Sequence, residues 1–269
     1  MAPFIPHGFI PVLTRRFPLD ELLRPHVEAL CPAALYSVPE LLTGAAPLAR
    51  LPLLIDSGGY AALSPGDRVQ EVDGLGQLVL GSTEAITPQL VHDLQSKHAS
   101  TGFTLDFPVP GHADDTELVL RRRLSHVNAL WALAQPRSFT LYASVQPFTD
   151  PEPYLLAGAD GVALGGLAGF SGNRERLTQE VERLRCLIPP GFPLHVFGIG
   201  HPESVRAVLA AGATSTDSSA CQRLAADGRS WAGEHIEGAS PPERLRLGLS
   251  NLITVRHATV PLALHPLWR

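Results

Sequence analysis

The stretch LPLLIDSGGY, residues 51–60, holds the pattern that decides the fold: a short apolar run that ends in an acid, a serine and two glycines. The same design recurs along the chain. Candidate strands, each ended by Gly, Pro, Ser or Asp, are Leu51–Asp56, Gly102–Asp106, Ser138–Val145, Gly161–Leu164, Leu194–Gly198 and Ser215–Asp217. Apolar residues at three- and four-residue spacing between them predict helices, so the pattern indicates βα units around a parallel sheet.

This alternation predicts an α/β fold, a (β/α)8 TIM-type barrel in a single domain over residues 1–269. Six strands are clear from the pattern, and a barrel needs two more. Phe9–Leu13 and Ala33–Tyr36 could supply them or could belong to an N-terminal cap within residues 1–50. Residues 67–81, rich in glycine with alternating apolar positions, predict a hairpin inserted after the second βα loop. An open doubly wound sheet is the alternative, but no G-x-G-x-x-G follows an early strand.

Composition and charge narrow the class of protein. Of the 269 residues, 45% are hydrophobic, which is enough for a sizeable core and excludes disordered and fibrous classes. Lys and Arg number 21 against 26 Asp and Glu, and the net charge of −5 argues against sequence-blind polyanion binding over the whole surface while allowing a local basic groove. The chain has three widely spaced cysteines, no apolar run of the ~18 residues that a membrane span needs, and no leader pattern at Met1. A cytoplasmic protein without a membrane partner is expected.

Polar residues and glycines cluster where the predicted strands end. The closures are Asp56-Ser57-Gly58-Gly59-Tyr60, Asp106, Gln146, Gly165-Gly166-Leu167 and Asp217-Ser218-Ser219, with Gly198-Ile199-Gly200 beside them. The carboxyl ends of barrel strands meet at one mouth, so three like charges would share it. One carboxyl should then have a raised pKa and act as an acid, while another stays anionic as a nucleophile. The glycines would let a planar ligand approach the backbone, and Tyr60 could lie flat against it.

Each closure alone also has a purely structural interpretation. An aspartate at a strand end often caps the next helix, and glycine pairs can satisfy turn geometry or bind phosphate, as in many barrels. The histidines His112, His195, His201, His235 and His257 fit no metal-ligand spacing, so surface or hydrogen-bonded roles are expected for them. Arg121-Arg122-Arg123 is interpreted as the solvated face of a helix.

Five of these blocks, taken in order, resemble the tRNA-guanine transglycosylase superfamily. They are Asp56-Ser57-Gly58-Gly59-Tyr60, Gln146, Gly165-Gly166-Leu167-Ala168, Phe197-Gly198-Ile199-Gly200-His201-Pro202-Glu203 and Asp217, and with similar spacing they cover the chain from Leu51 to Gly233. The tail, Asp217-Ser218-Ser219 followed by Ala226-Asp227-Gly228-Arg229, is more similar to bacterial and phage paralogues associated with 7-deazaguanine in DNA than to the tRNA enzymes.

The resemblance implies a base exchange, in which guanine in DNA or tRNA is replaced by a 7-deazaguanine such as preQ0 or preQ1. It implies Asp217 as the nucleophile and Asp56 as the general acid/base, chemistry that suits an oxocarbenium-like transition state and a glycosyl-enzyme intermediate. The substrate-binding candidates are Ser57, Gly58, Gly59, Tyr60, Asp106, Gln146, Gly165, Gly166, Leu167, Gly198 and Gly200. Among these, Asp106, Gln146 and the backbone around Gly166 would read the base edge, and Tyr60 would stack on it.

The resemblance also sets expectations for partners and cofactors. The partners would be a nucleic acid and a free guanine or 7-deazaguanine base, with no cofactor, and an accessory protein could supply nucleic-acid binding. Arg223 and Arg229 are candidates for phosphate contacts. The family's structural zinc uses Cys-x-Cys-x-x-Cys and a distant His, whereas only Cys221 lies downstream of Asp217, so no metal is expected. Other hypotheses stay open: an N-glycosidase with water as acceptor, a non-catalytic binder of guanine or deazaguanine, and a phosphate-binding barrel isomerase.

Overall fold

Eight parallel strands form the centre of the molecule. The computed structural model describes residues 4–14, 18–44, 48, 50–64, 66–81, 84–167 and 173–259. The strands are β1 Gly8–Pro11, β2 Ala34–Ser37, β3 Leu53–Asp56, β7 Thr101–Phe103, β8 Thr140–Val145, β9 Gly161–Leu164, β10 Leu194–Val196 and β11 Ser215–Ser218. Their spatial order, β1-β11-β10-β9-β8-β7-β3-β2, follows the chain around a ring without reversal. The predicted TIM-type barrel is therefore confirmed, and the doubly wound alternative is wrong.

The ring closes between β1 and β2. Val12 and Leu35 form an isolated parallel bridge, and the Leu13 N–H donates to the Leu35 carbonyl at 2.9 Å. The two N-terminal segments that the sequence left undecided are thus barrel strands. Each is only four residues long, which is why the apolar pattern alone did not separate a strand from a cap.

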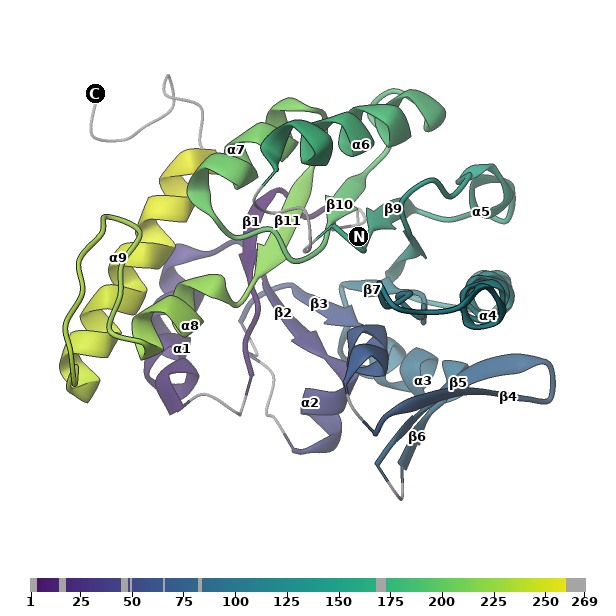
Figure 1. The fold of residues 1–269 in the computed structure, drawn as a ribbon, viewed down its shortest axis with the longest axis horizontal. Helices are drawn as coiled ribbons and strands as arrows, with labels where there is room; N and C mark the ends of the chain where they lie inside the picture. Colours follow the sequence, from purple (N-terminus) through teal and green to yellow (C-terminus); the bar gives the residue numbers. More distant parts are fainter. Residues whose placement is uncertain are drawn as a thin grey trace.

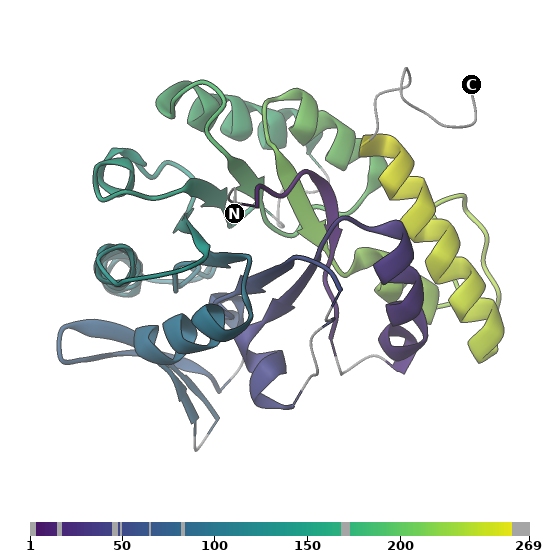
Figure 2. The same ribbon diagram turned by 180° about the vertical axis from the view of Figure 1, so that it is seen from behind.

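Helices surround the strands (Figures 1 and 2). They are α1 Pro18–Leu30, α2 Val38–Leu42, α3 Pro88–His98, α4 Asp115–Leu133, α5 Glu152–Leu156, α6 Arg174–Leu187, α7 Pro202–Ala210, α8 Ala220–Ala226 and α9 Pro241–Thr259. Their starts follow the expected chemistry: Thr87, with Pro88 next, accepts from the Leu90 N–H, and Asp114 accepts from the Glu117 N–H. Both views place α9 beside α1.

Two hydrophobic layers result from the alternation of side chains along the strands. Residues such as Leu53 and Ile55 point outward into a core shared with the helices. The inward residues fill the barrel as a separate cluster, which comprises Ile10, Ala33, Leu35, Leu54, Phe103, Tyr142 and Ala163. Because successive residues of a strand face opposite ways, Asp56 shares the inner face with Leu54. The polar strand ends therefore lie above a packed apolar interior.

A small antiparallel sheet is inserted between β3 and α3. It contains β4 Arg68–Val72, β5 Leu75–Leu80 and β6 Glu84–Ile86, and it stands out from the barrel beside α3 (Figure 2). The insertion thus follows the third barrel strand, not the second βα loop. It also has a third strand that the sequence analysis missed, because three residues are too short to show alternation. Buried Asn128 of α4 anchors the sheet: it accepts from the Gly76 N–H at 2.8 Å and donates to the Gly76 carbonyl at 3.0 Å.

Candidate active site

The predicted site residues lie at the carboxyl end of the barrel strands. Asp56 ends β3 and Asp217 is the third residue of β11, while Gln146 and Gly165 directly follow β8 and β9. Asp106 comes three residues after β7. Five of the eight strands therefore bring predicted site residues to one mouth, four of them with polar side chains. Ala168, the last residue of the third block, lies outside the described residues.

Three carboxylates influence one another at this mouth. Burial, followed by the charges of Asp106 and Asp217, raises the pKa of Asp56 from 3.8 to about 7. One of its oxygens, Oδ2, accepts from the Gly58 N–H at 3.1 Å. Burial also raises the pKa of Asp106 to about 6, although the hydrogen bond from Gln146 acts in the opposite direction and lowers it. Near neutral pH, Asp56 can thus both hold and release a proton, which is the property that a general acid/base requires.

Asp106 and Gln146 form a pair. The Gln146 Nε2 donates to Asp106 Oδ2. The amide and the carboxylate therefore lie side by side at the mouth. Close packing of the loops holds this pair in place. A Cβ on Gly59 would lie 1.9 Å from the Asp106 carbonyl oxygen, and one on Gly166, which has φ +72°, would lie 2.6 Å from Gln146 Oε1. These two glycines are therefore required for the packing of one loop on the next.

The Asp217 carboxylate is held by two N–H donors. Its Oδ1 is 3.0 Å from His195 Nε2 and accepts from the Gly198 backbone N–H at 3.2 Å. The other ring nitrogen of His195, Nδ1, is 2.8 Å from Ser215 Oγ. Sequence analysis expected a hydrogen-bonded or surface histidine here and missed the contact with Asp217. The signal was available in principle, because His195 lies within an apolar strand that precedes the one carrying Asp217.

The remaining predicted residues differ in exposure. Tyr60, in the 3-10 helix Gly59–Leu63, is 69% exposed, so its ring is free to meet a ligand. Ser57 is buried at the mouth, and its hydroxyl has no hydrogen-bond partner among the described residues. Leu167 is also buried. The Phe197 ring, which was not among the predicted contacts, packs 4.8 Å from Phe103.

Arg121 is a further residue whose role the sequence analysis misjudged. It is only 5% exposed, so the predicted solvated face is wrong for this residue. Its guanidinium donates to the Pro108 carbonyl at 2.7 Å and to the Ala62 carbonyl at 3.1 Å. Arg121 therefore ties the loop after β3, which directly follows Asp56, to the loop after β7, which carries Asp106.

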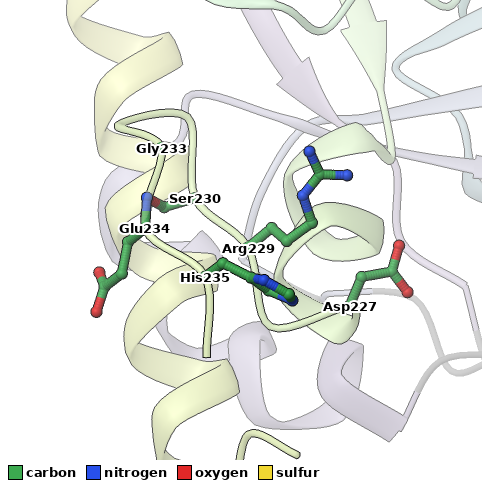
Figure 3. A pocket seen from close by; sticks show the side chains of 6 residues that line it. All are labelled: Asp227, Arg229, Ser230, Gly233, Glu234 and His235. Atoms are coloured by element: carbon green, nitrogen blue, oxygen red, sulfur yellow. The ribbon is translucent and has the colours of Figure 1, made fainter. Parts of the chain in front are cut away.

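The two candidate phosphate-binding arginines are exposed. Arg223 lies on α8, and Arg229 follows it in a loop. Arg229 borders a hollow of about 460 Å³ that is also lined by Asp227, Ser230, Gly233, Glu234 and His235 (Figure 3). Glu234 points to the other side of this loop and pairs with Arg246 at 3.1 Å. Within the described ranges, no hydrogen bond or ion pair engages the Arg229 guanidinium, so it is available to an anion.

A structural zinc does not fit these residues. No group of three or more His, Cys, Asp or Glu in the described part of the chain could hold a metal ion. Cys221 is buried in α8, where burial raises the pKa of its thiol to about 12. None of the helices in the described part of the chain is apolar over a length that could cross a membrane.

The geometry first defines a class: a (β/α)8 barrel that gathers carboxyl groups at one mouth, one of which, Asp56, can exchange a proton near neutral pH. The chain belongs to the queuine tRNA-ribosyltransferase family, whose sequence model matches residues 42–260. Members of this family are pentosyltransferases that act as guanine transglycosylases on nucleic acid. The comparison with curated proteins finds no match.

Proposed function

We propose that this protein exchanges guanine in DNA or tRNA for a 7-deazaguanine base of the preQ0 or preQ1 type through a covalent glycosyl-aspartate intermediate. The observation that carries the proposal is the contrast between two carboxyls of one mouth. The pKa of Asp56 is raised to about 7, whereas Asp217 accepts two N–H donors as a carboxylate does. Two carboxyls in such different surroundings are suited to different roles, Asp56 to acid–base catalysis and Asp217 to nucleophilic attack.

The proposed reaction consists of two displacements at C1′. Asp217 attacks C1′ of the target nucleotide, the C1′–N9 bond breaks, and the departing guanine takes its electron pair and a proton from Asp56. The incoming base then gives a proton to the Asp56 carboxylate and attacks C1′, which releases Asp217. Two inversions retain the β-configuration, and the sugar never meets free water as a nucleophile.

Recognition of the base is proposed for the Asp106–Gln146 pair. As an anion, Asp106 would accept from the N1–H and the exocyclic amine of a guanine-like ring, a pattern that adenine lacks. Gln146 already donates to Asp106, and it would turn its amide toward the base. Tyr60 would stack on the ring, since its exposed side chain lies four residues after Asp56.

The target base must leave the base stack of the nucleic acid to reach the site, because the mouth lies at the ends of buried strands. Exposed Arg223 and Arg229 would contact phosphates. The net charge of −5 offers little general attraction for a polyanion, so an accessory protein that brings the nucleic acid is part of the proposal.

Trapping of the intermediate tests the proposal. The protein is incubated with duplex DNA, single-stranded DNA or tRNA in the presence of 9-deazaguanine, then denatured and analysed by mass spectrometry. We expect one polymer to give a covalent adduct with the wild type and none with Asp217→Asn. Asp93→Asn, which changes an exposed carboxylate on α3, is the matched control and should form the adduct normally. An adduct that survives Asp217→Asn would refute the mechanism, and release of guanine without any incoming base would support hydrolysis instead.

A further inference from the structure

His195 occupies the barrel interior directly next to Asp217. It lies on β10, its exposed fraction is 0%, and β10 pairs with β11 so that His195 is in register with Ser215. Two residues further along β11, on the same face, is Asp217. The imidazole therefore spans from Ser215 Oγ at 2.8 Å to Asp217 Oδ1 at 3.0 Å.

The surroundings of the imidazole restrict it to this position. The Phe103 ring lies 5.1 Å and the Phe197 ring 4.9 Å from it, centroid to centroid. A polar ring packed against two aromatic rings in a buried layer satisfies its nitrogens through the polar groups at its two ends. Because a carboxylate only accepts, Nε2 carries the hydrogen toward Asp217, and Nδ1 faces the Ser215 hydroxyl, a group that can both donate and accept.

The two oxygens of Asp217 are consequently unequal. Oδ1 accepts from both His195 Nε2 and the Gly198 N–H, while no hydrogen bond to Oδ2 is found among the residues that the structure describes. Two donors on one oxygen fix the rotation of the carboxylate plane. Oδ2 keeps its lone pairs for attack, and its direction is set before any substrate binds.

Resting on the proposed function, we propose that His195 is a positioning residue: it holds Asp217 Oδ1 so that Oδ2 is the atom that bonds to C1′. In the step itself, an Oδ2 lone pair forms the bond to C1′ as the C1′–N9 bond breaks. The His195 proton stays on Nε2, so the histidine takes no part in proton transfer to the base.

Two amide variants of His195 distinguish a positioning role, which needs a donor at the place of Nε2, from a role that needs only a polar side chain. In His195→Gln the new side-chain amide nitrogen can reach the place of Nε2, whereas the shorter amide of His195→Asn ends near the place of Nδ1 and cannot reach Asp217. We expect His195→Asn to lower the rate of adduct formation by about 100-fold, the loss typical of a misplaced reacting group, with an unchanged KM for the free base. His195→Gln should stay within about tenfold of the wild type. His7→Gln, which changes an exposed histidine ahead of β1, is the control.

A second measurement does not depend on activity. Long-range ¹H–¹⁵N spectra of histidine-labelled protein should show His195 as the Nε2–H tautomer, and Asp217→Ala should change its nitrogen shifts while leaving those of His7 in place. Equal adduct rates for the wild type, His195→Asn and His195→Gln would overturn the positioning role while leaving the proposed function intact. A wild type that forms no adduct with any of the polymers would refute the proposed function and the positioning role together.

Discussion

Replacing Asp56 by asparagine should stabilise the protein at alkaline pH. The pKa of this carboxyl is raised from 3.8 to about 7, mainly by burial and then by the charges of Asp106 and Asp217. The folded state therefore binds the Asp56 proton more tightly than the unfolded chain does. This contribution to stability is complete below about pH 4 and is lost as the pH rises through about 7. Asparagine carries no charge at any pH, and its oxygen can still accept from the Gly58 N–H.

The size of the effect follows from the shift. A rise from 3.8 to about 7 is about 3 pKa units, which corresponds to about 4 kcal/mol between the fully protonated and fully ionised limits. The part of this change that falls between about pH 5 and about pH 8 is about 2.5 kcal/mol. Over that interval the wild type should lose about 2.5 kcal/mol of unfolding free energy relative to Asp56→Asn.

Urea unfolding followed by circular dichroism at pH 5 and pH 8 measures this difference. Asp93→Asn serves as the control for the loss of one surface carboxylate. Since Asp56→Asn should also abolish base exchange, the variant would be more stable and inactive at pH 8. If the stability difference between Asp56→Asn and the wild type is the same at both pH values, Asp56 is not held protonated in the fold and the assignment of the acid is wrong.

Three further predictions concern two loops near the site and the anchor of the inserted sheet, and each is measured by urea unfolding. Phe148 has φ +65°, so Phe148→Gly should raise the unfolding free energy by about 1 kcal/mol by relieving left-handed strain, whereas Phe148→Ala should not. In Gly59→Ala the new Cβ would meet the Asp106 carbonyl oxygen at 1.9 Å, so a loss of about 2 kcal/mol is expected; Gly111→Ala, which meets nothing within 4 Å, should be neutral. Asn128→Ala removes the hydrogen bonds that anchor the inserted sheet and should cost about 3 kcal/mol.

The sequence was sufficient to predict the barrel because six of its eight strands carry their own local signal. Short apolar runs with polar closures alternate with helical periodicity, and parallel strands joined in this way have few alternative arrangements. Closure is different, because it depends on one bridge between Val12 and Leu35. No local pattern encodes a contact between the first and second strands of a ring. The two N-terminal segments therefore stayed ambiguous until the structure placed them.

The site residues that end strands could be predicted from the sequence. The residues that connect neighbouring strands or loops could not. Asp56 and Gln146 each close an apolar run, and Asp217 ends the predicted strand Ser215–Asp217, so position alone marks them. Arg121 lies in the middle of a helix, and only the folded chain shows that it bridges two loops by way of the Ala62 carbonyl. A run of three arginines usually indicates a solvated face, and here the first of the three is buried.

The arrangement also explains how one small mouth can hold three acids. Burial alone would disfavour the charge on each of them. Asp217 has two donors to one of its oxygens, His195 on β10 and the Gly198 N–H in the loop after it. Burial, followed by the charges of Asp106 and Asp217, raises the pKa of Asp56, and the hydrogen bonds found for it among the described residues come from backbone N–H groups of its own loop. In the proposed mechanism, the different roles of the two acids follow from the strand order: Asp217 lies beside β10 and its donors, and Asp56 lies beside the loop that carries Asp106.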